Sequence, residues 1–331
     1  MSDENQNDKW VMSEAVRAAY RAGQDDEQLE PIVLVDGAGQ PIGRIQDGDY
    51  VIFYDLRGER EIELTQSLTD PDFDKFPRAP IEVPFVTMIE YDPDLNVRVA
   101  FPPPGKIEHT LPHVVAAHGL QQAKVVESEK SVHLTYYLNG KDDQALPGED
   151  RFILPSPHVQ DYGQVPELNA AGVGDAALAA IANSDYCLIS VNFANTDVIG
   201  HIENPEAIKT AVHTVDTQMG RLVQAAQEAG VTVAITADHG TVERWYYPDG
   251  AIDTGHTDSP VPFILIDSDL QDAALRTGGA LTDIAPTVLH LLGLPKPEVM
   301  TGTSLFQNGI PDTARRVLLI IADGWGAREE T

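Results

Sequence analysis

The sequence has little cysteine, little positive charge and no long apolar run. Its 331 residues include one cysteine, and 22 lysines and arginines stand against 52 aspartates and glutamates, for a formal net charge of −30. The single cysteine, Cys187, excludes an intrachain disulfide framework. The negative charge would repel phosphate backbones, so we expect no nucleic-acid partner. No apolar run reaches the length of a membrane span, so we expect no membrane partner.

The rest of the composition is that of a globular protein. Hydrophobic residues make up 42% and charged residues 22% of the chain, with 26 glycines and 23 prolines. This length suits one large domain or two ordinary ones. The first ten residues, MSDENQNDKW, are polar and acidic and contain no signal-peptide pattern, so we expect a cytoplasmic protein. The acidity favours a salt-adapted proteome, and an acidic interaction surface is the alternative.

The pattern of predicted elements changes near residue 104. Before it, spacing and turn residues predict a helix at 10–23, a hairpin at 31–45 and strands within 49–61, 84–92 and 97–105. Three prolines at 102–104 form a stiff break, where we place a domain boundary.

After the break, strands alternate with helices. Helices are predicted at 109–119, 172–184, 207–230 and 281–293, strands at 124–129, 132–140, 186–193, 231–240, 261–267 and 315–324, and an irregular segment at 147–157. Several of these strands are apolar throughout. This pattern is typical of an α/β protein with a parallel sheet buried on both faces.

Acids and histidines cluster at the ends of the apolar strands. The candidates are Asp197 and His201 after strand 186–193, Asp238 and His239 in 231–240, His256 before 261–267, and Asp323 in 315–324. Each alone is weak evidence, because a single histidine or Asp-Gly pair is more often structural. Together they would meet beyond the carboxyl ends of the strands, where α/β sheets bind ligands. Mixed carboxylate and imidazole ligands favour two Mn²⁺ or Zn²⁺ ions, which suits phosphoryl transfer.

Several segments resemble one known family. SVNFANTDVIGH, ITADHG, GHTDSPVPFIL and VLLIIADGWG are similar to the 2,3-bisphosphoglycerate-independent (cofactor-independent) phosphoglycerate mutases of the alkaline phosphatase superfamily. VIFYDLRGER, VVESEKSVHLTYYLNG and PGEDRFILPSP extend the resemblance beyond the metal motifs, which phosphopentomutases and sulfatases share. The resemblance runs from about Ser13 to Leu305 and includes the C-terminal tail.

The resemblance implies an α/β fold with an alkaline-phosphatase-like, mostly parallel sheet, helices on both of its faces, and part of an α/β inserted transferase domain. Residues 1–103 would be the C-terminal half of this inserted, substrate-binding domain. Residues 104–306 would be the metal-binding phosphatase-like domain. Residues 307–331 would be a linker and the family's first strand, here placed last by a circular permutation.

The resemblance also assigns roles to residues. Asp197, His201 and His256 would bind one Mn²⁺, and Asp238, His239 and Asp323 the other. Arg57 and Arg60 would grip the phosphoglycerate, and Lys130 would lie near the transferring phosphoryl group. Without the resemblance, the two arginines are better interpreted as a solvated turn paired with neighbouring glutamates, and Lys130 as a surface lysine.

The family's nucleophile, a serine in a Gly-Asn-Ser-Glu segment, is absent from this sequence. The implied reaction is the conversion of 3-phosphoglycerate to 2-phosphoglycerate through a phosphoserine. We therefore expect the chain alone to bind Mn²⁺ without turnover. A second polypeptide would supply the serine and the rest of the inserted domain. The alternatives are a fragment or rearranged gene product, and a non-catalytic metal-binding pseudoenzyme with an interaction role. A metal-dependent phosphatase or sulfatase of the same fold is less favoured.

Overall fold

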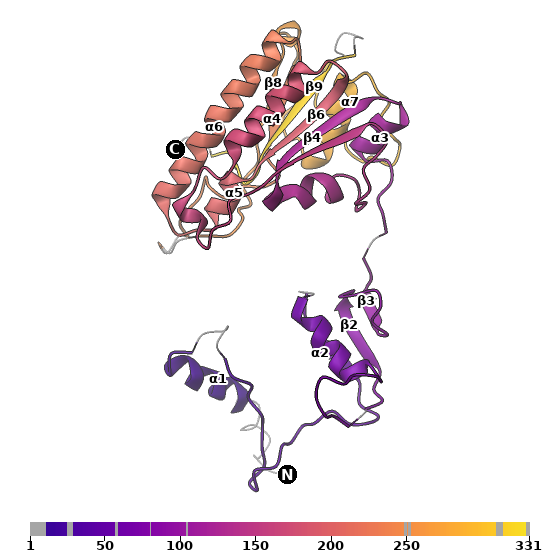
Figure 1. The fold of residues 1–331 in the computed structure, drawn as a ribbon, viewed down its shortest axis with the longest axis vertical. Coiled ribbons are helices and arrows are strands. Elements are labelled where there is room, and N and C mark those ends of the chain that lie inside the picture. The colour runs from indigo at the N-terminus through magenta and orange to yellow at the C-terminus, as the bar shows by residue number, and fades with distance from the viewer. Residues whose placement is uncertain are drawn as a thin grey trace. The chain divides into compact units, whose positions relative to one another are not determined.

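The computed structural model describes residues 11–24, 29–56, 59–79, 81–103, 105–247, 250, 253–308 and 314–328. The chain divides into two compact units, Met1–Pro104 and Gly105–Thr331, and each contains its own sheet (Figure 1). Within the described part of the chain, no helix combines the length and the apolar composition that crossing a membrane requires.

The first unit contains a small sheet of three parallel strands. These are β1 (Val51–Phe53), β2 (Phe85–Ile89) and β3 (Arg98–Phe101), in that order across the sheet. Helix α1 (Val11–Arg21) confirms the first predicted helix, whereas helix α2 (Glu59–Thr69) was not predicted. The charged stretch that forms α2 has a weak apolar periodicity, so the sequence pattern did not indicate a helix there.

Of the hairpin predicted at 31–45, the turn and one bridge are present, but the two strands are not. Within the described residues 29–56, the pairing there is a single antiparallel bridge between Val35 and Pro41. Val33 and Val35 are 61% and 48% exposed. The segment therefore has a turn but no buried apolar face, and an isolated strand pair without one is marginal in water.

The second unit is built on a six-stranded sheet with the order β5-β4-β6-β9-β7-β8. All neighbouring strands are parallel except β8, which runs antiparallel to β7. The strands are β4 (Gln121–Glu127), β5 (Glu149–Leu154), β6 (Tyr186–Phe193), β7 (Thr232–Thr236), β8 (Phe263–Ile266) and β9 (Val317–Ala322). The predicted α/β class with a mostly parallel sheet is confirmed.

Helices cover both faces of this sheet. One apolar cluster joins β6, β7 and β9 to α4 (Ala170–Ala182) and α6 (Pro205–Glu228), and a second joins the opposite face to α3 (Leu111–Ala117) and α7 (Ile284–Leu291). Covering both faces explains why β9 is apolar at every position and β6 at most of its positions.

The last strand of the sequence, β9, lies in the middle of the sheet. It pairs in parallel with β6 and with β7, and Leu319 is in register with both Ser190 and Ala234. Alternate side chains of β9 enter the two apolar clusters, with Leu318 in one and Leu319 in the other. The strand delivers Asp323 to the same edge of the sheet as the residues that follow β6 and β7.

Two predicted elements next to β4 are wrong. Residues 132–140 were expected to form a strand, but His133–Tyr137 form a π-helix that follows the 3₁₀ turn η3 (Ser128–Lys130). Residues 147–157 were expected to be irregular, yet they contain β5. Because β5 already pairs with the free edge of β4, residues 132–137 cannot join the sheet there and form helical turns instead. The Thr135 hydroxyl donates to the Ser131 carbonyl within these turns.

Candidate metal centre

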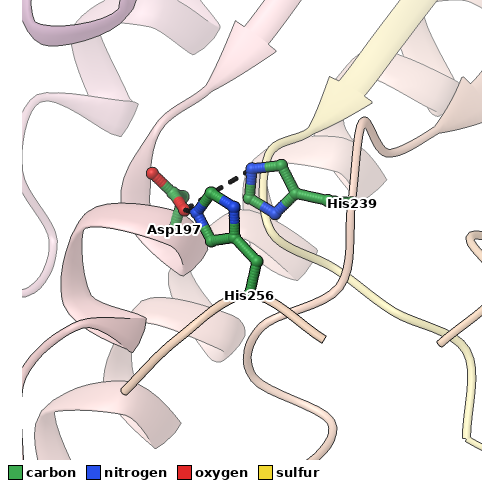
Figure 2. A group of neighbouring side chains, drawn as sticks. All are labelled: Asp197, His239 and His256. Atoms are coloured by element: carbon green, nitrogen blue, oxygen red, sulfur yellow. Dashed lines mark ion pairs between the residues drawn. The ribbon is translucent and has the colours of Figure 1, made fainter. Parts of the chain in front are cut away.

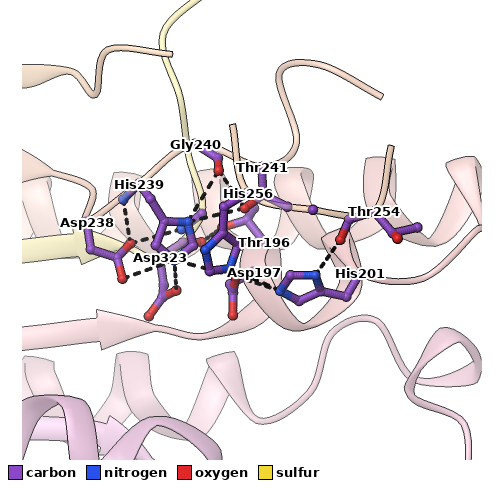
Figure 3. A network of polar contacts seen from close by, with 12 residues as sticks. Thr196, Asp197, His201, Asp238, His239, Gly240, Thr241, Thr254, His256 and Asp323 are labelled. Atoms are coloured by element: carbon purple, nitrogen blue, oxygen red, sulfur yellow. Dashed lines mark hydrogen bonds and ion pairs between the residues drawn. The ribbon is translucent and has the colours of Figure 1, made fainter. Parts of the chain in front are cut away.

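The carboxyl ends of the parallel strands bring the candidate ligands together. Asp197 lies in the short helix α5 (Asn195–Gly200), which begins two residues after β6, and His201 follows that helix. Asp238 and His239 follow β7, and Asp323 directly follows β9. His256 comes from the loop before β8. Figure 3 shows all six side chains side by side in one network, as expected where carboxyl ends of parallel strands meet.

One carboxylate oxygen of Asp197 faces three imidazoles. Its Oδ1 lies 3.1 Å from Nε2 of His201, 3.2 Å from Nε2 of His256 and 3.6 Å from Nε2 of His239. The rings of His239 and His256 stack with centroids 3.7 Å apart, and both turn towards Asp197 (Figure 2).

His239 also faces the two other acids. Its Nε2 lies 3.4 Å from Asp238 Oδ2 and 3.8 Å from Asp323 Oδ1. Two groups therefore have ligand atoms within 4.8 Å of one another: Asp197, His239 and His256, and Asp238, His239 and Asp323. The second group has the members that the sequence predicted for one ion. In the first, His239 joins the predicted Asp197 and His256, while Nε2 of the predicted His201 lies 3.2 Å from Nε2 of His256.

Lys130 lies between two of these carboxylates. It ends η3, and its Nζ donates to Asp197 Oδ2 at 2.5 Å and to Asp323 Oδ1 at 3.0 Å. It is 7% exposed, so it is not the surface lysine that the sequence alone would favour. Burial disfavours the charged form of Lys130, but the nearby charges of Asp323 and Asp197 together have a larger effect. They raise the pKa of Lys130 above its ordinary value.

The pKa values of Asp323 and Asp197 shift in opposite directions. Asp323 is fully buried, and burial together with the charge of Asp238 raises its pKa to about 6. Burial also opposes the charge of Asp197, but the hydrogen bond and charge of Lys130 outweigh it and lower that pKa. Burial and the neighbouring His239 lower the pKa of His256, which favours a neutral imidazole with a free lone pair.

Further contacts hold the ligands in place. Asn192 donates to Asp323 Oδ2 at 2.9 Å, and Nδ1 of His201 lies 2.5 Å from the Thr254 carbonyl. Gly324 has a φ of +78°, and a Cβ there would meet the Asp197 backbone at 2.8 Å. Glycine is therefore required at position 324, because the backbone of Asp197 lies too close for a side chain. The Asp-Gly pair is not a simple surface turn.

Glu243 was missed by the sequence analysis. Its carboxylate accepts from the backbone N–H of Thr241 at 2.9 Å and of Gly326 at 3.1 Å, and from the Thr257 hydroxyl. These partners lie one to three residues from His239, His256 and Asp323, so one side chain ties together three ligand-bearing loops. In the sequence, the one sign that Glu243 belongs to the site is its position four residues after His239. That spacing matches no metal-ligand pattern.

The remaining predicted site residues belong to the first unit. Arg57 lies outside the described residues, and Arg60 is in helix α2, where only its backbone is described. Cys187 stays outside the centre, and burial raises the pKa of its thiol to about 11, as expected for an inert residue.

A family model of the metalloenzyme superfamily matches residues 42–296. A 2,3-bisphosphoglycerate-independent phosphoglycerate mutase of Thermomicrobium roseum is 44% identical over 299 residues, which cover 88% of this chain and 57% of that protein. One from Acaryochloris marina is 43% identical, covering 90% of this chain and 56% of that protein. The chain thus spans little more than half the length of these relatives.

The fold is similar to that of a Leishmania mexicana phosphoglycerate mutase, whose crystal structure was determined at low cobalt concentration. The TM-score is 0.64 at 28% identity, over 89% of this chain and 57% of that one. This similarity supports an alkaline-phosphatase-like architecture.

Proposed function

The chain belongs to the metalloenzyme superfamily, and we propose that it is the metal-binding part of a cofactor-independent phosphoglycerate mutase. The observation that carries the proposal is the convergence of three carboxylates and three imidazoles beside a buried lysine. The relatives' activity and the resemblance of the flanking segments supply the substrate class, 3-phosphoglycerate and 2-phosphoglycerate.

The residues present fit a pair of divalent cations. Asp197, His201 and His256 would hold one and Asp238, His239 and Asp323 the other, with His239 near enough to Asp197 to bridge the two groups. Among the described contacts of this cluster, the ammonium of Lys130 pairs with Asp197 and Asp323, while Asp238 faces His239. One ammonium beside three carboxylates leaves negative charge that cations would balance. This mixed oxygen and nitrogen donor set suits Mn²⁺, with Zn²⁺ as the alternative.

The chain's own residues would bind and orient the substrate. Arg57 and Arg60 would grip phosphate and carboxylate oxygens, since guanidinium forks match both groups. Lys130, held by Asp197 and Asp323, would keep a fixed positive charge beside the transferring phosphoryl group. Bound divalent cations would supply Lewis acidity and lower the pKa of the attacking hydroxyl.

The serine that receives the phosphoryl group would come from a second polypeptide. The group would pass from the 3-hydroxyl of phosphoglycerate to this serine and then to the 2-hydroxyl, so no co-reactant is consumed. The partner would also carry the rest of the substrate-binding domain, of which residues 1–103 would be the C-terminal half. Strand β9 would then be the family's first strand, reached by a permuted route, and its central place in the sheet supports this.

The test compares the purified chain with the chain isolated from its host. We expect the chain alone to bind Mn²⁺ in calorimetry but not to convert 3-phosphoglycerate. Native mass spectrometry of the isolated complex should reveal a stoichiometric partner with a Gly-Asn-Ser-Glu segment, and this complex should be active. Mutase activity of the uncontaminated chain would refute the need for a partner. A lone, inactive 36.0 kDa species would favour a non-catalytic metal-binding protein.

Replacing Glu243 with alanine should weaken Mn²⁺ binding by roughly 10–100-fold, because residues that support metal ligands have effects of this size. Glu243→Gln should keep most of the affinity, since its amide oxygen can still accept from Thr241 and Gly326. Calorimetry with Mn²⁺ measures both variants. If Glu243→Ala lowered the melting temperature yet bound Mn²⁺ normally, Glu243 would stabilise the fold without positioning the ligands.

A further inference from the structure

One segment outside the metal centre contacts two of its parts at once. Residues 155–169, which we call the strap, follow strand β5 and end where α4 begins. The strap contacts the turn η3, which ends at Lys130, and the start of α5, which carries Asp197. Lys130 and Asp197 form an ion pair at the metal centre. The strap is therefore placed to fix the two members of that pair relative to each other.

Reciprocal hydrogen bonds tie the strap to η3. The backbone N–H of Ser156 donates to the Ser128 hydroxyl at 2.9 Å, and the backbone N–H of Glu129 donates to the Ser156 hydroxyl at 3.1 Å. Further along the strap, the Tyr162 hydroxyl donates to Glu129 Oε2 at 3.1 Å. Ser128 and Glu129 are exposed, so burial contributes little to their placement, and these bonds define where the turn before Lys130 lies.

A buried carboxylate anchors the strap at the end of β4. Glu127, the last residue of this strand, is 0% exposed, and both of its carboxylate oxygens accept from the backbone N–H of Asn169, at 3.1 and 3.2 Å. Burial raises the pKa of Glu127, and hydrogen bonds from the Asn169 N–H and the Ser156 hydroxyl oppose this effect. Removing the Ser156 hydroxyl would therefore take a donor from Glu127 and an acceptor from the Glu129 N–H.

The strap also holds the helix that carries Asp197. The side-chain amide of Asn195, which is 0% exposed, donates to the carbonyls of Pro166 at 2.9 Å and Glu167 at 2.8 Å. Leu168 packs against the apolar cluster of α5 and α6. Its φ is +45°, a left-handed conformation that leucine rarely adopts. Such strain persists only where the surrounding contacts determine the backbone, so α5 sets the path of the strap here.

We propose that the strap is a positioning element for phosphoryl transfer, with Ser156 as its main positioning residue. By holding η3 at one point and α5 at another, the strap keeps the ammonium of Lys130 against Asp197 and Asp323. A positive charge that is already in place needs no reorganisation during the transfer. The role in transfer rests on the proposed function, whereas the placement of Lys130 can be measured in the chain alone.

The test follows the Lys130 ammonium by NMR in the full, metal-free chain. Lysine labelled with an NMR-active nitrogen at Nζ gives a signal for ammonium groups that carboxylates hold, and loss of one signal in Lys130→Arg identifies the signal of Lys130. Ser156→Ala should speed the exchange of these ammonium protons with water by roughly 2- to 10-fold, the factor that corresponds to one hydrogen bond. Ser156→Thr keeps the hydroxyl and should restore the wild-type rate.

Ser304→Ala is the matched control. Ser304 is half-buried like Ser156, and its hydroxyl lies 2.9 Å from Nδ1 of His290 in helix α7. Its loss should leave the Lys130 signal unchanged. Urea unfolding shows whether each variant is folded. An unchanged exchange rate in folded Ser156→Ala, or equal acceleration in Ser304→Ala, would overturn the positioning role.

Tyr162→Phe tests the strap through a second contact. It removes the hydrogen bond to Glu129 and leaves Ser156 in place. Tyr162 is half-buried and loses only its hydroxyl, so this variant should fold. It should also speed the exchange of the Lys130 ammonium. If Ser156→Ala did not fold, an unchanged rate in Tyr162→Phe would overturn the proposal.

The outcomes also separate the strap from the proposed function. In the active complex with Mn²⁺, Ser156→Ala should lower kcat and leave KM nearly unchanged, because a displaced Lys130 weakens an interaction made in the transition state. Faster ammonium exchange in the variant, with no mutase activity of the wild-type complex, would keep the strap's hold on Lys130 and refute the mutase. A wild-type kcat despite faster exchange would overturn the role in phosphoryl transfer.

Discussion

Replacing Lys130 with methionine should destabilise the metal-free protein by about 3–5 kcal/mol, the usual loss when one member of a buried ion pair is removed. The ammonium of Lys130 lies between Asp197 and Asp323, which are 5% and 0% exposed. Without it, two buried carboxylates lose their nearby counter-charge. Urea unfolding in the presence of EDTA, with the metal-free wild-type chain as reference, measures the loss.

Saturating Mn²⁺ should restore most of this stability, because bound cations supply the missing positive charge and stabilise the folded state by mass action. Lys124→Met is the matched control. Lys124 is also buried and pairs with Glu149 at 3.1 Å, but neither residue belongs to the metal centre. Mn²⁺ should therefore leave the difference between Lys124→Met and wild type unchanged. Equal rescue of both variants, or of neither, would argue against a metal centre at Lys130.

Asp323→Asn should have effects of opposite sign on stability and on metal binding. Without metal, the variant should be more stable than wild type by roughly 3 kcal/mol at pH 7, the free energy that corresponds to the raised pKa of about 6. The amide keeps an oxygen that can accept from Lys130. Mn²⁺ affinity should fall by more than the roughly 10–100-fold typical of residues that only support ligands.

The pH dependence of the stability gain follows from the direction of the pKa shift. Below about pH 4, Asp323 is protonated in both the folded and the unfolded chain, so it imposes no penalty. As the pH rises from about 4 to 6, the unfolded chain releases its proton first and the folded state loses stability. The penalty is complete above about pH 6, where the folded carboxyl also ionises. The advantage of Asp323→Asn should therefore develop between pH 4 and 6 in metal-free unfolding experiments.

Asp283→Asn is the control with the opposite expectation. Asp283 is 6% exposed, and its pKa is lowered by the backbone N–H of Thr303 and further by Arg276, whose guanidinium lies 2.5 Å away. Its replacement should destabilise the chain and leave Mn²⁺ affinity unchanged. If Asp323→Asn behaved in the same way, Asp323 would be a structural acid and not a metal ligand.

The sequence predicted the elements that local pattern controls. Residues 186–193 are apolar at six of eight positions, and the strand within 315–324 is apolar from Val317 to Ala322. A parallel sheet covered on both faces is the structure that requires this. The apolar pattern gave wrong predictions where the conformation of a segment depends on which strand already pairs beside it. Residues 132–140 have the composition of a strand, but β5 already pairs with that side of β4, and the segment forms a π-helix.

The sequence by itself determined the residue types of the candidate metal centre and their positions after apolar strands, because carboxyl ends of parallel strands share one edge of a sheet. Only the tertiary structure decided that β9 enters the middle of the sheet, that Lys130 lies between Asp197 and Asp323, and that Glu243 ties the ligand loops together. Those contacts join residues far apart in the chain. Local periodicity carries no information about such pairings, which are selected by burial and charge when the whole unit folds.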